Sequence, residues 1–110
     1  MTIKEERTRQ ALRDLAAQFI SEQSNRTSLI TVTNVELGNR GKNATVWVTV
    51  MPEKEEAVVS EFLDRKRIEM RNFLKGKIQL RVLPHFEFII DLGEKNRQKI
   101  DRIIYEDQNR

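Results

Sequence analysis

The chain contains no cysteine and a single histidine, His85, among its 110 residues. Disulfides and thiolate metal sites are therefore excluded, and neither a zinc site nor a Cys/His catalytic pair can be assembled. Phosphate loops of the form G-x-x-x-x-G-K-[ST] and nucleophile elbows of the form G-x-S-x-G are also missing. We therefore expect that the protein is not an enzyme and binds no metal and no cofactor. His85 is interpreted as a structural or surface residue.

Long apolar runs are absent as well. None approaches the roughly 20 residues needed to span a bilayer, and the charged segment 1–7 leads into no apolar stretch typical of a signal peptide. Together with the lack of cysteine, which suits a reducing compartment, this predicts a cytoplasmic protein without a membrane segment. A chain of 110 residues has room for one domain, and a monomer is expected because no long apolar stripe is left over.

The charge that is present is distributed unevenly. Overall, 20 Lys and Arg face 17 Asp and Glu, a net charge of +3 that favours an anionic partner only weakly. Residues 53–64 hold five acids and one lysine, whereas residues 64–81 hold seven cations and two acids. The chain is therefore electrically polarised along this part of the sequence.

Apolar residues between Ile3 and Gln23 recur at spacings of three and four, which predicts an amphipathic helix. The polar turn residues 24–27 end it. Leu29–Leu37 and Ala44–Met51 alternate apolar and polar side chains and are rich in β-branched residues, so both are predicted strands. The short glycine-containing loop between them predicts an antiparallel hairpin.

Acidic residues after Pro52 favour the start of a second helical segment, for which Gly76 is a natural end. Cations interrupt its apolar stripe, so we expect a kink or tight turn near Arg65 to Ile68 that separates two helices. Alternation from Ile78 predicts a third strand that bulges or breaks at Pro84 and then resumes. Isoleucines at helical spacing near the C-terminus are enough for a short terminal helix.

The predicted order is helix, strand, strand, helix–kink–helix, strand. This is an α+β fold with a three-stranded sheet and helices packed on one face. We expect a domain over residues 1–93 and a short helical tail over residues 94–110.

The order of elements is that of a type II KH domain, and four sequence motifs narrow the resemblance to one family. Residues 32–36 (VTNVE) and 44–50 (ATVWVTV) match the first two strands of one family. Residues 70–74 (MRNFL) are similar to its I-R-x-x-L pattern, and residues 80–91 (LRVLPHFEFIID) to its L-R-x-x-P-x-L-x-F-x-x-D pattern. Over most of its length, from about Arg7 to Asp91, the chain therefore resembles ribosome-binding factor A.

The resemblance implies a non-catalytic maturation factor that binds the small (30S) ribosomal subunit and its 16S rRNA and assists late rRNA processing and subunit assembly. The chain departs from the family in two places. The A-x-G usual at the interhelical kink is here 66–68 (KRI), which lacks the conformational freedom of glycine. The acid-and-leucine pair before the second strand is here 40–41 (RG).

KH folds grip backbone nucleotides through a GXXG loop, and this chain has none. The three cations Arg65–Arg67 lie where the fold uses that loop, and ionic contacts there would read RNA shape and charge rather than base sequence. We therefore favour RNA contact over a merely solvated face. For the hairpin-loop residues Arg40 and Lys42, contact and solvation are weighed equally. The predicted RNA-binding residues are Arg65, Lys66, Arg67, Arg71, Lys75, Lys77, Arg81, Arg40 and Lys42.

Two other readings stay open. One is a KH-like module for other RNA, such as single-stranded transcripts, against which the missing GXXG argues. The other is a protein-interaction adaptor whose acidic segment Glu53–Glu61 docks a basic partner. Trp47 is predicted either to lie partly exposed on the open sheet face or to be covered by the terminal helix.

Overall fold

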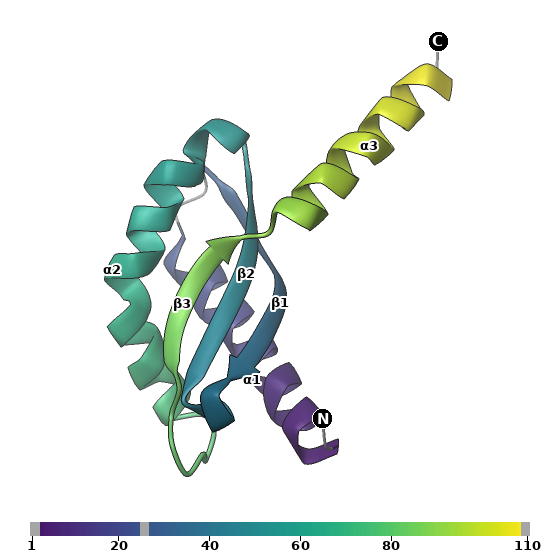
Figure 1. The fold of residues 1–110 in the computed structure, drawn as a ribbon. Helices are drawn as coiled ribbons and strands as arrows, with labels where there is room; N and C mark the ends of the chain where they lie inside the picture. The colour runs from purple at the N-terminus through teal and green to yellow at the C-terminus, as the bar shows by residue number, and fades with distance from the viewer. Residues whose placement is uncertain (1–2, 25–26, 109–110) are drawn as a thin grey trace.

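The computed structural model describes residues 3–24 and 27–108 (Figure 1), so the predicted turn at Asn25 and Arg26 lies outside the described residues. Two short 3-10 turns, η1 and η2, punctuate the longer elements. In chain order the elements are α1 (Ile3–Gln23), β1 (Leu29–Gly38), η1 (Asn39–Gly41), β2 (Asn43–Met51), η2 (Glu53–Glu55), α2 (Glu56–Lys75), β3 (His85–Ile90) and α3 (Leu92–Gln108).

The three strands form one sheet in the order β1-β2-β3. β1 and β2 pair antiparallel, which confirms the predicted hairpin, and β3 adds to β2 in parallel. α1 and α2 lie on the same face of this sheet, whereas the opposite face stays open (Figure 1). The predicted α+β layer with helices on one face is therefore confirmed.

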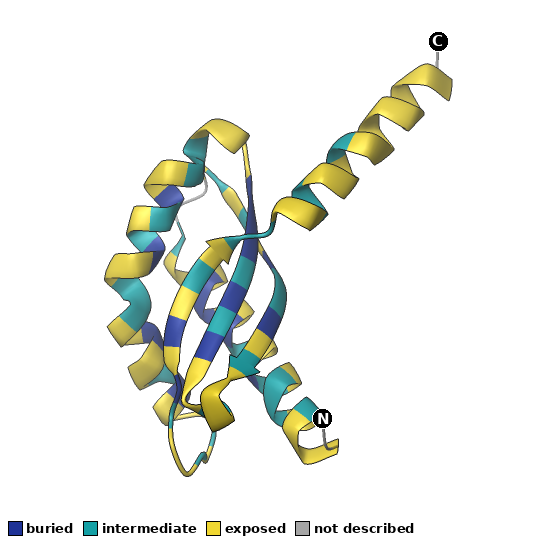
Figure 2. Cartoon of the chain, viewed as in Figure 1, coloured by how far each residue is buried: buried dark blue, intermediate teal, exposed yellow. Residues whose placement is uncertain are grey.

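One hydrophobic core joins the sheet to α1 and α2. The inward residues of β2 alternate with outward ones, so the valines meet the apolar stripes of both helices (Figure 2). Each fully buried apolar side chain contributes about 1.5–3 kcal/mol relative to an exposed one. The central members are Val46 and Val48 of β2, Leu12 and Ile20 of α1, Leu63, Met70 and Leu74 of α2, and Phe86 of β3.

The expected kink near Arg65 to Ile68 is wrong, because α2 is one continuous helix from Glu56 to Lys75. No glycine or proline lies between these two residues, so nothing interrupts the helical hydrogen bonds. The apolar stripe is not lost at the cations either. Lys66 and Arg67 are half-buried, which their long aliphatic stems allow while the charged ends stay near water.

The third strand is also shorter than predicted, because residues 76–84 form a connection without strand structure and β3 begins at His85. Its pairing starts where the His85 amide donates to the Lys42 carbonyl at 2.8 Å. The hairpin ends at that level, so residues 78–82 have no neighbouring strand to pair with. Ile78 and Leu80 still pack against the core, which explains the alternation in their sequence.

α3 begins at Leu92, two residues before the start of the predicted tail, and has 17 residues. It projects from the body of the molecule (Figure 1), and none of its described residues is buried. None of the described helices has the length and apolar character required to cross a membrane. The division into residues 1–93 and 94–110 stays a prediction.

Asp91 fastens the start of α3 to the sheet. Its Oδ1 accepts a hydrogen bond from the Glu94 amide at 3.0 Å, and its Oδ2 accepts one from Thr33 Oγ1 at 2.6 Å. Thr33 is the extra residue at the β1 bulge between Val32 and Asn34. These hydrogen bonds, that of Thr33 first, lower the pKa of Asp91.

Ion pairs tie the first two turns of α3 to η2 and the start of α2. Lys95 Nζ lies 2.7 Å from Glu53 Oε1 and 2.9 Å from Glu56 Oε2. Lys99 Nζ lies 3.4 Å from the same Glu53 oxygen. Hydrogen bonds to Glu53 and then Glu56 raise the pKa of Lys95, and the bond to Lys95 lowers the pKa of Glu53. Glu53 and Glu56 therefore already have partners within the molecule.

Candidate nucleic-acid interface

The continuous α2 separates the three consecutive cations that sequence analysis grouped together. Successive residues of an α-helix point about 100° apart around its axis. Arg65, Lys66 and Arg67 therefore face different directions and do not form one patch. Arg65 is exposed, whereas Lys66 and Arg67 are half-buried.

Arg67, Arg71 and Lys75 recur every fourth residue and lie along one side of α2. We call these three residues the α2 stripe. Arg71 Nη2 donates to the Leu83 carbonyl at 3.5 Å, so this side of α2 faces the 76–84 connection. Arg71 and Lys75 are exposed. Arg67 Nε is buried without a hydrogen-bond acceptor among the described residues.

Arg65 and Lys66 have other surroundings. Arg65 lines a small cavity with Ser24 and Phe62. Lys66 Nζ forms an ion pair with Glu69 at 3.3 Å and lies 6.0 Å from the centre of the Phe62 ring. Both residues thus lie away from the α2 stripe.

Lys77 follows the end of α2 and is exposed. Its Nζ lies 5.7 Å from the centre of the Phe73 ring, a cation–π contact that fixes the ammonium near the surface. The Phe73 ring itself packs against Phe19 of α1, with ring centres 5.5 Å apart. Lys77 is therefore held on the side of α2 that faces α1.

The structure brings Arg40 and Arg81 together, although 41 positions separate them in the sequence. Both line a groove between α1, η1 and the 76–84 connection. Lys4 lines the same groove and was missed by sequence analysis, because acids follow it directly in α1 and no motif marks it. Lys42 is exposed beside the groove and does not line it.

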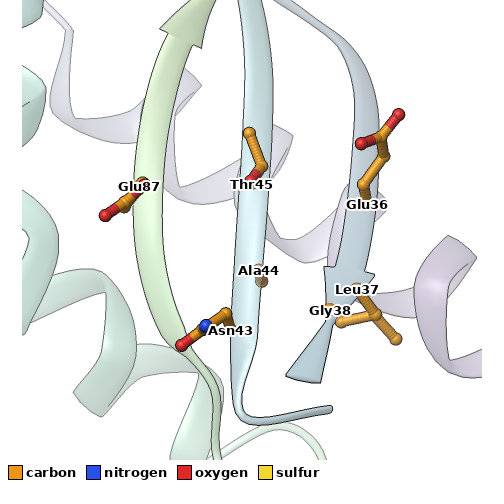
Figure 3. A pocket seen from close by; sticks show the side chains of 7 residues that line it. All are labelled: Glu36, Leu37, Gly38, Asn43, Ala44, Thr45 and Glu87. Atoms are coloured by element: carbon orange, nitrogen blue, oxygen red, sulfur yellow. The ribbon is translucent and has the colours of Figure 1, made fainter. Parts of the chain in front are cut away.

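The sheet carries none of these cations, since β1, β2 and β3 contain no lysine or arginine. Its open face instead presents Glu36 and Glu87 on either side of Thr45, in register across the three strands. A shallow pocket of 280 Å³ lies at this place (Figure 3). Carboxylates repel phosphate, so the open sheet face is a poor surface for an RNA backbone.

Trp47, on β2, is half-buried and its Nε1 is enclosed without an acceptor among the described residues. Its neighbours in the strand register are Asn34 and Ile89. The ring is therefore not the open platform on which an RNA base would stack.

The comparisons with known proteins point to one family. The sequence profile of ribosome-binding factor A matches residues 4–104. Ribosome-binding factor A of Nitrosomonas eutropha is 33% identical over 99 residues, which cover 88% of this chain and 85% of that protein. Ribosome-binding factor A of Staphylococcus saprophyticus is 29% identical over 100 residues, which cover 90% of this chain and 86% of that protein.

Solved structures agree. The crystal structure of ribosome-binding factor A from Thermus thermophilus superposes with a TM-score of 0.68 at 26% identity, covering 77% of this chain and 92% of that chain. A homology model of Thermus thermophilus ribosome-binding factor A, fitted into the cryo-EM map of a 30S complex of that protein, superposes with a TM-score of 0.65 at 26% identity. The match covers 74% of this chain and 89% of that chain. The type II KH-like fold expected from the sequence is thereby confirmed. The chain belongs to the ribosome-binding factor A family.

Proposed function

We propose that this protein is a non-catalytic maturation factor that binds the small (30S) ribosomal subunit and assists late processing of its 16S rRNA and assembly of the subunit. The family match over residues 4–104 carries this proposal. The structural relative fitted into a 30S complex supports the choice of the small subunit. We expect the protein to act as a monomer in the cytoplasm.

The α2 stripe is the proposed contact with the rRNA backbone. Its three cations follow one side of a rigid helix, and Arg71 and Lys75 are exposed there. Cations at regular spacing on a rigid element match the regular spacing of phosphates, and such contacts position a protein on RNA without reading base sequence. Of the remaining predicted contacts, Arg40 and Arg81 line the separate groove beside η1. Contacts of RNA with Lys42, Lys77, Arg65 and Lys66 stay predictions.

The adaptor alternative is weakened by the ion pairs of the acidic segment. Glu53 and Glu56 already bind Lys95, and Glu53 also binds Lys99. A basic partner that docked on this segment would have to displace those pairs. The alternative of a KH-like module for other RNA is disfavoured for a different reason, because the continuous α2 leaves no loop at residues 65–68 that could replace the GXXG clamp.

Co-sedimentation with isolated 30S subunits, 50S subunits and 70S ribosomes at two salt concentrations tests the proposal. The parent protein should migrate selectively with 30S subunits and dissociate as salt rises. An R71E/K75E variant should lose at least tenfold in affinity. The slope of the logarithm of its binding constant against the logarithm of salt concentration should become shallower by about 0.9 for each cation removed. The charge is reversed only at these two residues, because Arg67 is half-buried and a change there would also affect folding.

Arg102→Glu is the matched control, since Arg102 is exposed on α3 and lies outside the α2 stripe. It should bind like the parent. Migration of the parent with 50S subunits, or with none of the particles, would refute the function. A loss in Arg65→Glu but not in R71E/K75E would show that a different side of α2 meets the RNA.

A further inference from the structure

A groove of 690 Å³ lies between the first turns of α1, η1 and the 76–84 connection. These three segments lie at the end of the molecule opposite α3 (Figure 1). Its volume falls within the range of about 300–1,000 Å³ typical of sites for small ligands. The buried Leu12 and Pro84, together with Leu37, Leu80 and Val82, give it an apolar lining. The groove is thus large enough for a nucleotide and offers it apolar contact.

Positive charge surrounds this lining. Lys4, Arg40 and Arg81 reach the groove from three separate segments of the chain, and Glu5 is the one acid among the lining residues. Arg81 is exposed, as are Lys4 and Arg40, so the three charged groups are accessible to a ligand. The arrangement matches a ligand that is anionic along one edge and apolar on its faces.

The backbone that presents Arg40 is strained. Asn39, Arg40 and Gly41 all have positive φ, at 51°, 56° and 84°. Glycine tolerates this left-handed region and asparagine visits it, but arginine is disfavoured there. Strained residues concentrate at functional sites, where the side chain is needed at that place. The loop therefore holds an arginine at the groove in a conformation that glycine would adopt more easily.

We propose that this groove binds an unpaired nucleotide of the RNA, with its phosphates on Arg40, Arg81 and Lys4 and its base against the apolar lining. The inference rests on the proposed function and adds to it a second RNA contact. Bases inside a duplex are stacked and paired, so their faces are not available to such a lining, whereas an unpaired base can enter it. Arginine also stacks its planar guanidinium on bases.

Continuity of charge favours RNA over an acidic peptide. Arg81 lines the groove, and Leu83, only two residues later, accepts the hydrogen bond from Arg71 of the α2 stripe. A phosphate backbone that leaves the groove therefore reaches the α2 stripe across the same connection. The groove would hold the unpaired nucleotide while the stripe holds the neighbouring backbone.

Fluorescence anisotropy tests the inference with two labelled probes, a ten-nucleotide single-stranded RNA of mixed sequence and a blunt ten-base-pair RNA duplex. Arg40→Gly removes the side chain and suits the positive φ, so it should fold at least as well as the parent. Arg81→Ala is the second variant. Arg7→Ala is the matched control, an exposed arginine on α1 that does not line the groove. Circular dichroism checks that each variant is folded.

Arg40→Gly and Arg81→Ala should each weaken binding of the single strand about tenfold, the loss expected for one charge-assisted contact. Each should also reduce its salt slope by about 0.7. Binding of the duplex should stay unchanged, and Arg7→Ala should match the parent with both probes.

Three results would overturn the inference: no binding of the single strand by the parent, equal losses for both probes, or variants indistinguishable from Arg7→Ala. If the groove variants keep both RNA affinities but no longer migrate with 30S subunits, the groove binds a ribosomal protein instead. Selective migration of the parent with 30S subunits is measured alongside, so the proposed function can hold while the groove fails, or the reverse.

Discussion

The contact between Asp91 and Thr33 should make a measurable contribution to stability. Asp91→Ala removes the carboxylate that caps α3 and the acceptor of the Thr33 hydroxyl at 2.6 Å. Loss of an N-cap costs about 1 kcal/mol, and loss of one hydrogen bond costs about 1 kcal/mol. The free energy of unfolding should therefore fall by about 2 kcal/mol.

Two further variants separate the contributions. Asp91→Asn should lose about half as much, because asparagine caps helices as well as aspartate. Thr33→Val should leave the cap of α3 in place and remove the contacts of the Thr33 hydroxyl with Asp91 at 2.6 Å and with the Trp47 carbonyl at 3.3 Å. In the double variant T33V/D91A the losses should fail to add by about 1 kcal/mol, the coupling of the pair.

Urea unfolding followed by the fluorescence of Trp47, the single tryptophan, and by circular dichroism measures these free energies. The pKa of Asp91 is lowered in the folded protein, so its contribution is present above the ordinary aspartate pKa and disappears as pH falls through the folded value. The difference in unfolding free energy between the parent and Asp91→Ala should be constant from pH 7 to pH 5 and begin to narrow below about pH 4. A D91A variant as stable as the parent at neutral pH would refute the role of this contact.

Two other expectations follow from α2 and α3. Ile68 is 62% exposed in the middle of α2, so Ile68→Gly should be about 1 kcal/mol less stable than Ile68→Ala in urea unfolding. Equal stability would mean that residue 68 is not helical, as at the kink of the family. Lys95→Met should loosen α3 and speed amide hydrogen exchange in its first turns, because the ion pairs to Glu53 and Glu56 are lost. Unchanged exchange would show that these pairs do not hold the helix.

The sequence was sufficient for the elements whose burial pattern is regular. The stripe through Leu12, Ala16 and Phe19 predicted α1 with the bounds observed, and the alternating valines of β2 predicted the hairpin. It failed where one pattern fits two structures. Ile78 and Leu80 alternate as a strand does, yet the end of the hairpin leaves them no neighbour to pair with.

The candidate site was only partly predictable for a related reason. Cations that are consecutive in a sequence look like a patch, and a turn at residues 65–68 would have kept them together. In a continuous helix they diverge, and residues four apart, such as Arg71 and Lys75, become neighbours instead. Lys4 meets Arg40 and Arg81 only through the tertiary fold, so no local pattern could have joined them.

The position of α3 determines what a bound molecule presents to its surroundings. η1 and the 76–84 connection, which line the groove, lie with the C-terminal end of α2 at one end of the molecule, and α3 points away from that end (Figure 1). The molecule is 55 Å long. In a molecule that binds the ribosomal particle through its basic end, α3 would project away from the particle surface. A fluorophore near the C-terminal end of α3 would then report the orientation of the bound molecule without disturbing the residues that bind the particle.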